Sequence, residues 1–120
     1  MPRNKLLAGA LAAAILLAAG TASAHARLVA SSPAANAAVA PPRAVSLTFS
    51  ERLTPAFSAF DLTSGDGRRL GLKAALGPDG KTMVGAPQGP LRPGAYTVDW
   101  HAVSSGDGHR TEGRFRFTVR

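Results

Sequence analysis

The side chains of this sequence that could bind a metal ion are three histidines and a few carboxylates near them. His25 directly follows the small residues TASA, and His109 ends the segment Asp107-Gly108-His109. The chain contains no cysteine, so no thiolate is available as a metal ligand or a nucleophile. Imidazole and carboxylate groups are the ligand types that remain.

His25 becomes the first residue of the chain if a protease cuts after Ala24. Its α-amine and its imidazole can then both give up a proton near neutral pH and close one chelate ring around a metal ion. Nitrogen-rich, roughly square sites suit Cu(II), which also has the highest affinity among the first-row divalent ions. A histidine left beside a cleavage point by chance accounts for the same residue equally well.

Asp107 and His109 would supply the second half of such a site. The segment SSGDGHR lies between two predicted strands, where a loop can turn both side chains toward one point. A carboxylate beside an imidazole can bind the metal itself or orient the ring. The same residues also fit an ordinary Asp-Gly turn followed by an exposed histidine, so both interpretations stay open.

Three further residues are weaker candidates. Glu51 ends the strand-like run VSLTFSE. It is either a metal ligand or an exposed charge paired with Arg52. His101 falls on the polar face of its predicted strand, which favours an exposed or locally hydrogen-bonded residue. Met83 is more typical of a core position than of a ligand.

The first residues predict an export signal. Arg3 and Lys5 precede an apolar run from Leu6 to Gly20, and small residues follow. That order is typical of a secretory signal peptide with cleavage between Ala24 and His25. The run is shorter than the roughly 20 residues that a membrane-spanning helix needs. We therefore expect a periplasmic protein, or an extracellular one if the host lacks an outer membrane.

Cleavage would divide the chain into a signal peptide at 1–24 and one small domain at 25–120. Because Arg3 and Lys5 would leave, 12 of the 14 basic residues would remain against 7 acidic ones, a charge of +5. The arginines are scattered and are not interleaved with aromatic residues, so no nucleic-acid surface is expected. We expect a monomer whose fold is held by packing alone, since disulfides are excluded.

Period-two alternation between turns rich in glycine and proline predicts an all-β fold. Val45, Leu47 and Phe49 share one face of their run, and so do Phe115, Phe117 and Val119 of theirs. About seven strands in a domain of this length fit an immunoglobulin-like Greek-key β-sandwich or barrel, with a cupredoxin-like topology as the alternative. The strands are expected at 26–31, 44–50, 56–63, 68–75, 81–86, 94–103 and 113–119.

Together these pieces resemble the CopC family of periplasmic copper-binding proteins. The resemblance runs from HARLVASSPAANAAVAPPRAVSLTFSERL through PLRPGAYTVDWHAVSSGDGH to EGRFRFTV and covers nearly all of the chain after residue 24. It implies a seven-stranded β fold and one Cu(II) per mature chain, bound by the amine and imidazole of His25 with Asp107 and His109. Glu51 stands where some members place a glutamate near the site, which implies an outer or weak ligand.

The sequence departs from the family pattern at two points. Some members carry a second, methionine-rich site for Cu(I), whereas Met83 is the only methionine here after the leader. A single soft ligand cannot form such a site, so the resemblance implies the Cu(II)-only type. The second departure is His101, which stands where the family often has an arginine.

The resemblance implies a copper carrier or buffer in copper homeostasis or resistance, with a CopD-type membrane importer as a partner for delivery. One alternative is an oxidase or monooxygenase, because the terminal histidine resembles the histidine brace of lytic polysaccharide monooxygenases. An acidic ligand favours Cu(II) over redox cycling, and Tyr96 and Trp100 are expected on a buried face, so enzymatic activity is not expected. The other alternative is a metal-free interaction domain, since a sandwich fold does not set function.

Overall fold

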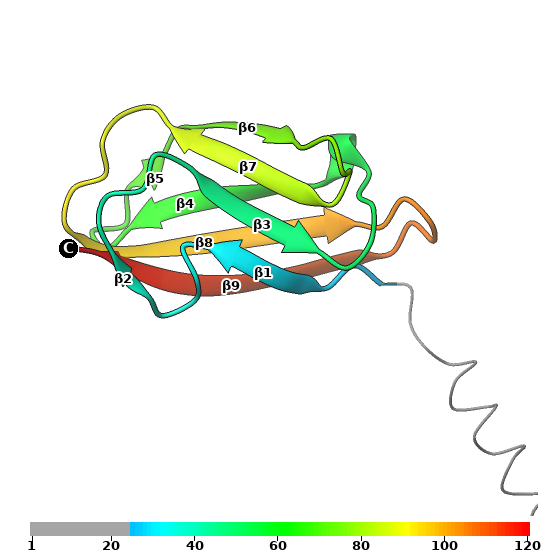
Figure 1. The fold of residues 1–120 in the computed structure, drawn as a ribbon, viewed down its shortest axis with the longest axis horizontal. Helices are drawn as coiled ribbons and strands as arrows, with labels where there is room; N and C mark the ends of the chain where they lie inside the picture. The colour runs from blue at the N-terminus through cyan, green and yellow to red at the C-terminus, as the bar shows by residue number, and fades with distance from the viewer. Residues whose placement is uncertain (1–24) are drawn as a thin grey trace, which may run out of the picture.

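The computed structural model describes residues 25–120, which form two β-sheets packed face to face (Figure 1). The predicted signal peptide at 1–24 lies outside the described residues. Within residues 25–120, no helix has the length and apolar character needed to cross a membrane.

The first sheet has the strand order β1-β3-β7-β6, and each neighbouring pair is antiparallel. Its two central strands, β3 and β7, alternate between core-facing and outward-facing residues, which is why the apolar positions of β3 are buried and its serine and threonine are partly exposed. The bounds are β1 at Leu28–Ser32, β3 at Val45–Phe49, β7 at Thr82–Pro87 and β6 at Leu72–Leu76.

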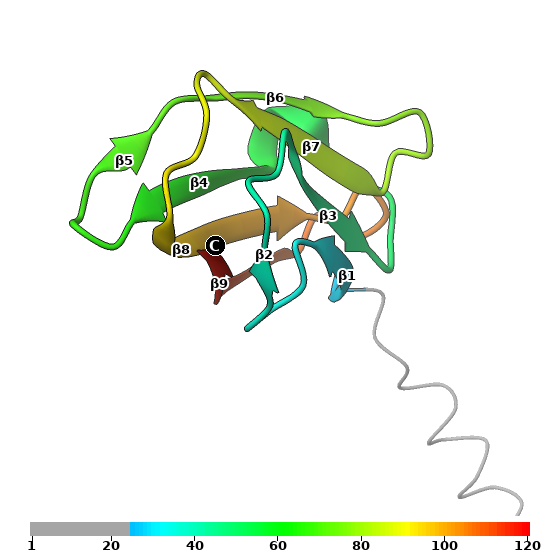
Figure 2. The same ribbon diagram turned by 60° about the vertical axis from the view of Figure 1, so that its left-hand side comes forward.

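The second sheet has the order β2-β9-β8-β4-β5, in which the short β2 runs parallel to the end of β9. The turned view in Figure 2 shows β6 and β7 of the first sheet above β4 and β8 of the second. This arrangement is the immunoglobulin-like sandwich that the alternation predicts. The bounds are β2 at Ala38–Val39, β9 at Arg110–Val119, β8 at Gly94–Val103, β4 at Ala59–Ser64 and β5 at Arg69–Leu70.

The core lies between the two sheets and contains most of the large apolar side chains of the domain. Met83 is 4% exposed and belongs to this core, which confirms the prediction that it is a packing residue. The fully buried strand residues include Val45, Leu47, Leu62, Val98 and Phe117. Burial of this kind is the main source of stability in a domain that has no disulfide.

A tyrosine corner ties the start of β8 to the loop before it. The Tyr96 hydroxyl donates a hydrogen bond to the carbonyl of Arg92 at 2.6 Å, and the ring stacks on Phe117 with 5.5 Å between ring centroids. This contact is a recurrent feature of immunoglobulin-like sandwiches at the same strand.

The prediction of one strand at 68–75 is wrong. The chain changes sheets at Gly71: β5 pairs with β4 in the second sheet, whereas β6 pairs with β7 in the first. A Cβ on Gly71 would lie 2.6 Å from the Gln88 side-chain oxygen, so this crossing suits a residue without a side chain.

Other strand limits also differ from the prediction. A 3-10 helix at Pro55–Phe57 delays the start of β4, because proline has no N–H to donate to a strand neighbour. β9 begins at Arg110 rather than 113, and the two-residue β2 was not predicted. Strands as short as β2 carry too few residues for alternation to be visible.

Candidate metal centre

The loop between β8 and β9 positions two of the predicted ligands. The Ser104 N–H donates to the carbonyl of His109 at 3.1 Å, and the Gly108 N–H donates to the carbonyl of Ser104 at 2.9 Å. Gly108 has a φ of 71°, in the left-handed region that glycine adopts without strain. The loop therefore turns tightly, and Asp107 and His109 stand on either side of its glycine.

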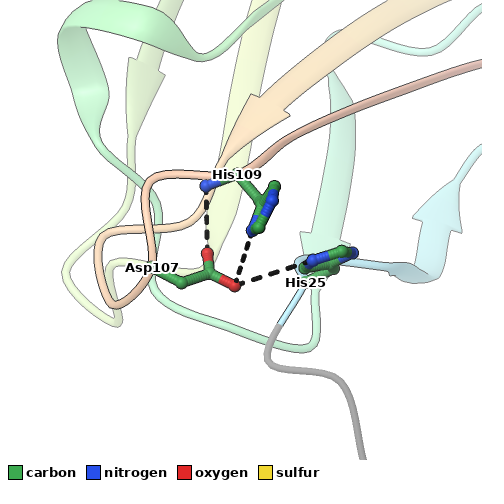
Figure 3. Close-up of side chains that lie close together, drawn as sticks. All are labelled: His25, Asp107 and His109. Carbon is green, nitrogen blue, oxygen red and sulfur yellow. Dashed lines mark hydrogen bonds and ion pairs between the residues drawn. The ribbon is translucent and has the colours of Figure 1, made fainter.

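The third predicted ligand comes from the start of the described chain. His25 precedes β1 of the first sheet, and the next residue, Ala26, is fully buried in the core. Figure 3 shows His25 at the end of the sandwich, beside the β8–β9 loop. Burial of the adjacent Ala26 fixes the backbone there.

His25, Asp107 and His109 form one compact group (Figure 3). One ligand atom from each of them lies within 4.8 Å of the others. Oδ2 of Asp107 is 3.3 Å from Nδ1 of His109 and 3.8 Å from Nε2 of His25. The two imidazole centroids are 4.2 Å apart. The structure thus brings together residues separated by more than half of the sequence.

The surroundings of Asp107 favour its charged form. Its Oδ1 accepts a hydrogen bond from the His109 backbone N–H at 3.0 Å. This bond is the main cause that lowers the pKa of the Asp107 carboxyl below its usual value. Partial desolvation acts in the opposite direction, and the two imidazoles lower the pKa further. The group therefore offers a carboxylate at neutral pH.

The contact between Asp107 and His109 also bears on which ring nitrogen is available to a metal. When His109 donates from Nδ1 to the carboxylate, its Nε2 is the nitrogen that carries the free lone pair.

The side chains of His25, Asp107 and His109 are 44%, 28% and 63% exposed. A metal ion can therefore approach the group from solvent.

Glu51 and His101 do not belong to this group. Glu51 lies just past the end of β3, and no ion pair joins it to Arg52 in the part of the chain that the structure describes. His101 lies on β8 opposite Glu112 of β9. It lines a separate groove of about 500 Å³ on the outer face of the second sheet. Among the described residues, that groove contains no comparable cluster of metal ligands.

Two residues next to the group were missed at the level of sequence. Ser50 and Thr111 make hydrogen bonds to the backbone around His25. Serine and threonine are frequent in strands and turns, so their residue types carry no signal for this role. Only the position of Ser50 beside Glu51 could have drawn attention to it.

Comparison with known proteins gives consistent results. The model of the CopC domain family matches residues 28–120, a range that begins shortly after His25. Copper resistance protein C of Escherichia coli is 44% identical over 108 residues, which cover 83% of this chain and 85% of that protein. Copper resistance protein C of Pseudomonas syringae pv. tomato is 43% identical over 117 residues, which cover 92% of each chain.

Solved structures with the same fold are also similar in sequence. PcoC, a methionine-rich copper resistance protein from Escherichia coli, has a TM-score of 0.74 and 44% identity, with 81% of this chain and 100% of PcoC covered. CopC from Methylosinus trichosporium OB3b has a TM-score of 0.73 and 33% identity, with 79% of this chain and 93% of that protein covered.

Proposed function

The chain belongs to the CopC domain family, and from this premise we propose that it is an exported copper-handling protein that binds one Cu(II) ion per mature chain. The site is the group of His25, Asp107 and His109. The observation that carries the proposal is that one nitrogen of each imidazole and one carboxylate oxygen of Asp107 all lie within 4.8 Å of one another.

The chemistry of the donors supports copper. Two imidazoles and one carboxylate make a nitrogen-rich set without a thiolate, which suits Cu(II) better than a soft metal ion. Removal of residues 1–24 would add the α-amine of His25 as a further nitrogen donor, so that the amine and Nδ1 chelate the ion together. Because Nε2 of His25 is the ring atom near Asp107 in the structure, chelation through Nδ1 requires the ring to turn about its Cβ–Cγ bond.

The absence of soft ligands supports a Cu(II)-only protein. PcoC is described as methionine rich, whereas this chain has two methionines in all, of which Met83 is buried in the core. A thioether enclosed in the core is not available to Cu(I) without unfolding. Glu51 remains a proposed outer or weak ligand.

The role that fits this site is that of a carrier or buffer. The similar proteins from Escherichia coli and Pseudomonas syringae are named copper resistance proteins, which supports copper handling rather than catalysis. We place the mature protein, as a monomer, in the periplasm, or outside the cell if the host lacks an outer membrane. A CopD-type membrane importer is the proposed recipient of the ion.

Two measurements on the exported protein test the proposal. Mass spectrometry determines whether its first residue is His25. Titration with Cu(II) under competition by a chelator then measures stoichiometry and affinity, and electron paramagnetic resonance detects the nitrogen ligands. We expect a chain that starts at His25, one equivalent of tightly bound Cu(II), and hyperfine coupling to nitrogen.

Other results would contradict the proposal at separate points. A different first residue would exclude the amine chelate, and the absence of tight binding with one ion per chain would leave only a metal-free role. Oxygen consumption with ascorbate above that of free copper would favour the oxidative alternative over a carrier.

A further inference from the structure

We infer that Ser50 and Thr111 are positioning residues that hold His25 at the correct distance from Asp107 and His109. Neither is a ligand: their hydroxyl groups bind the backbone of residues 25–27. This inference rests on the proposed copper function, because it concerns the geometry of the same site.

Ser50 holds the start of the chain from the first sheet. Its Oγ accepts a hydrogen bond from the Arg27 N–H at 2.9 Å and lies 3.4 Å from the carbonyl oxygen of His25, to which it can donate. The backbone N–H of Ser50 also donates to the carbonyl of Arg27 at 2.9 Å. One residue therefore contacts the backbone on both sides of Ala26.

Thr111 holds the same segment from the second sheet. Its hydroxyl donates to the carbonyl of Ala26 at 2.7 Å and lies 3.5 Å from the carbonyl of Ala102. Ala26 itself is fully buried, so its carbonyl has little access to water and needs a partner within the protein. Thr111 provides that partner.

The connection from His25 to His109 is consequently short. It passes from Ala26 through one hydrogen bond to Thr111, which lies two residues after His109 at the start of β9. A residue at a chain terminus is otherwise poorly ordered. Without the two hydroxyl contacts, His25 would spend less of its time beside the loop, and a larger share of bound ions would be held by His109 and Asp107 alone.

A purely structural role for the two hydroxyls is the competing explanation. In that case their removal would lower the stability of the domain without a selective effect on copper. The two explanations differ in the spectrum of bound Cu(II), which reports the number of nitrogen ligands and does not depend on the free energy of unfolding.

The test uses paired substitutions in the mature protein. Thr111→Val and Ser50→Ala remove the hydroxyl, whereas Thr111→Ser and Ser50→Thr retain it. Thr118→Val is the matched control, because Thr118 is an exposed residue at the other end of the same strand. For each variant, the Cu(II) dissociation constant, the electron paramagnetic resonance spectrum and the thermal midpoint without metal are measured.

We expect Thr111→Val and Ser50→Ala to raise the dissociation constant by about 10-fold or more, in the range known for residues that orient metal ligands. Their spectra should show a weaker contribution from His25 nitrogen. The variants that retain the hydroxyl should bind like the wild type, as should Thr118→Val. Wild-type affinity and spectra in both hydroxyl-free variants would overturn the inference, whatever the change in thermal midpoint.

A measurement without metal separates this inference from the proposed function. Hydrogen exchange of the Arg27 amide in the apoprotein should be faster in Ser50→Ala than in the wild type, because its acceptor is removed. If the wild type binds no copper, the proposed function fails, and the exchange rate alone then decides whether Ser50 orders this segment. An unchanged rate would refute that ordering.

Discussion

The carboxylate of Asp107 makes separate contacts through its two oxygens. Oδ1 accepts a hydrogen bond from the His109 backbone, while Oδ2 faces both imidazoles. Oδ1 thus stabilises the conformation of the loop, and Oδ2 faces the other two proposed ligands. A substitution at this residue can separate these roles if it retains the shape and removes the charge.

We predict that Asp107→Asn weakens Cu(II) binding by about 10- to 100-fold. The amide oxygen can still accept the His109 N–H, so the loop should keep its conformation while the negative charge is lost. Competition titration gives the affinity, and near-ultraviolet circular dichroism checks the fold. Unchanged affinity would exclude Asp107 from the metal centre.

A second prediction at the residue scale concerns the amine of His25. One alanine added before His25 in the mature chain keeps the imidazole but converts the amine of His25 into an amide, which is a poor ligand as long as it retains its proton. We expect the affinity for Cu(II) to fall by orders of magnitude and one nitrogen to be lost from the resonance spectrum. Removal of the alanine with an aminopeptidase should restore both, and equal affinity before and after would exclude the amine as a ligand.

Residue types pointed to three side chains that lie close together in the structure, but not to the hydroxyl groups beside them. His25, Asp107 and His109 carry side chains with obvious metal chemistry, and the structure brings all three together. The sequence could not show that Ser50 and Thr111 lie beside them. Contacts of a hydroxyl with distant backbone depend on how the two sheets meet, which no local pattern encodes.

At the scale of elements, alternation located β8 in full and β9 except for its first three residues. The predicted limits 94–103 agree with β8, in which the buried residues Tyr96, Val98 and Ala102 all lie on one face of the strand. The prediction failed where one continuous pattern serves two sheets, as at Gly71 between β5 and β6. Alternation describes which side of a strand is buried but not the sheet to which the strand belongs.

The side chain of Trp100 in β8 packs closely over Gly113 in β9, which gives a test of the contact between these two strands. A Cβ on Gly113 would lie 2.5 Å from a ring carbon of Trp100, whose indole packs edge to face against Phe49 at 5.1 Å between centroids. We predict that Gly113→Ala destabilises the domain by about 1–3 kcal/mol, the usual cost of overpacking. Urea unfolding followed by the fluorescence of this single tryptophan measures the change.

Gly89→Ala is the control for that experiment. No heavy atom lies within 4 Å of the position of its Cβ, so the substitution should change the free energy of unfolding by less than about 0.5 kcal/mol. Equal effects of the two substitutions would show that the contact between Gly113 and Trp100 adds no specific constraint.

At the scale of the whole molecule, stability should depend on pH through ionised carboxylates in turns. Asp79 accepts hydrogen bonds from the N–H groups of Lys81 and Thr82 and from the Thr82 hydroxyl. The bond from Lys81 is the main cause that lowers the pKa of Asp79 below 3.8. Its stabilising effect is complete above that value and is lost as the pH falls through the lower, folded-state pKa.

We predict that Asp79→Asn lowers the free energy of unfolding at pH 6 and that its difference from the wild type shrinks toward zero at strongly acidic pH. The reason is that the protonated wild type also lacks the charge. Urea unfolding of the metal-free proteins between pH 6 and pH 2 measures this difference. A difference independent of pH would show that the charge of Asp79 does not stabilise the fold.

The burial of Ala26 has a consequence for when the chain can be cut by a protease. A protease needs several extended residues on both sides of the bond it cuts, and here the second residue after the proposed cleavage point is enclosed by the core. Cleavage after Ala24, if it occurs, is therefore expected before the sandwich closes around Ala26. If the chain is cut after Ala24 as we propose, the amine of His25 is released before folding is complete, and binding of copper to the complete site follows as the last step.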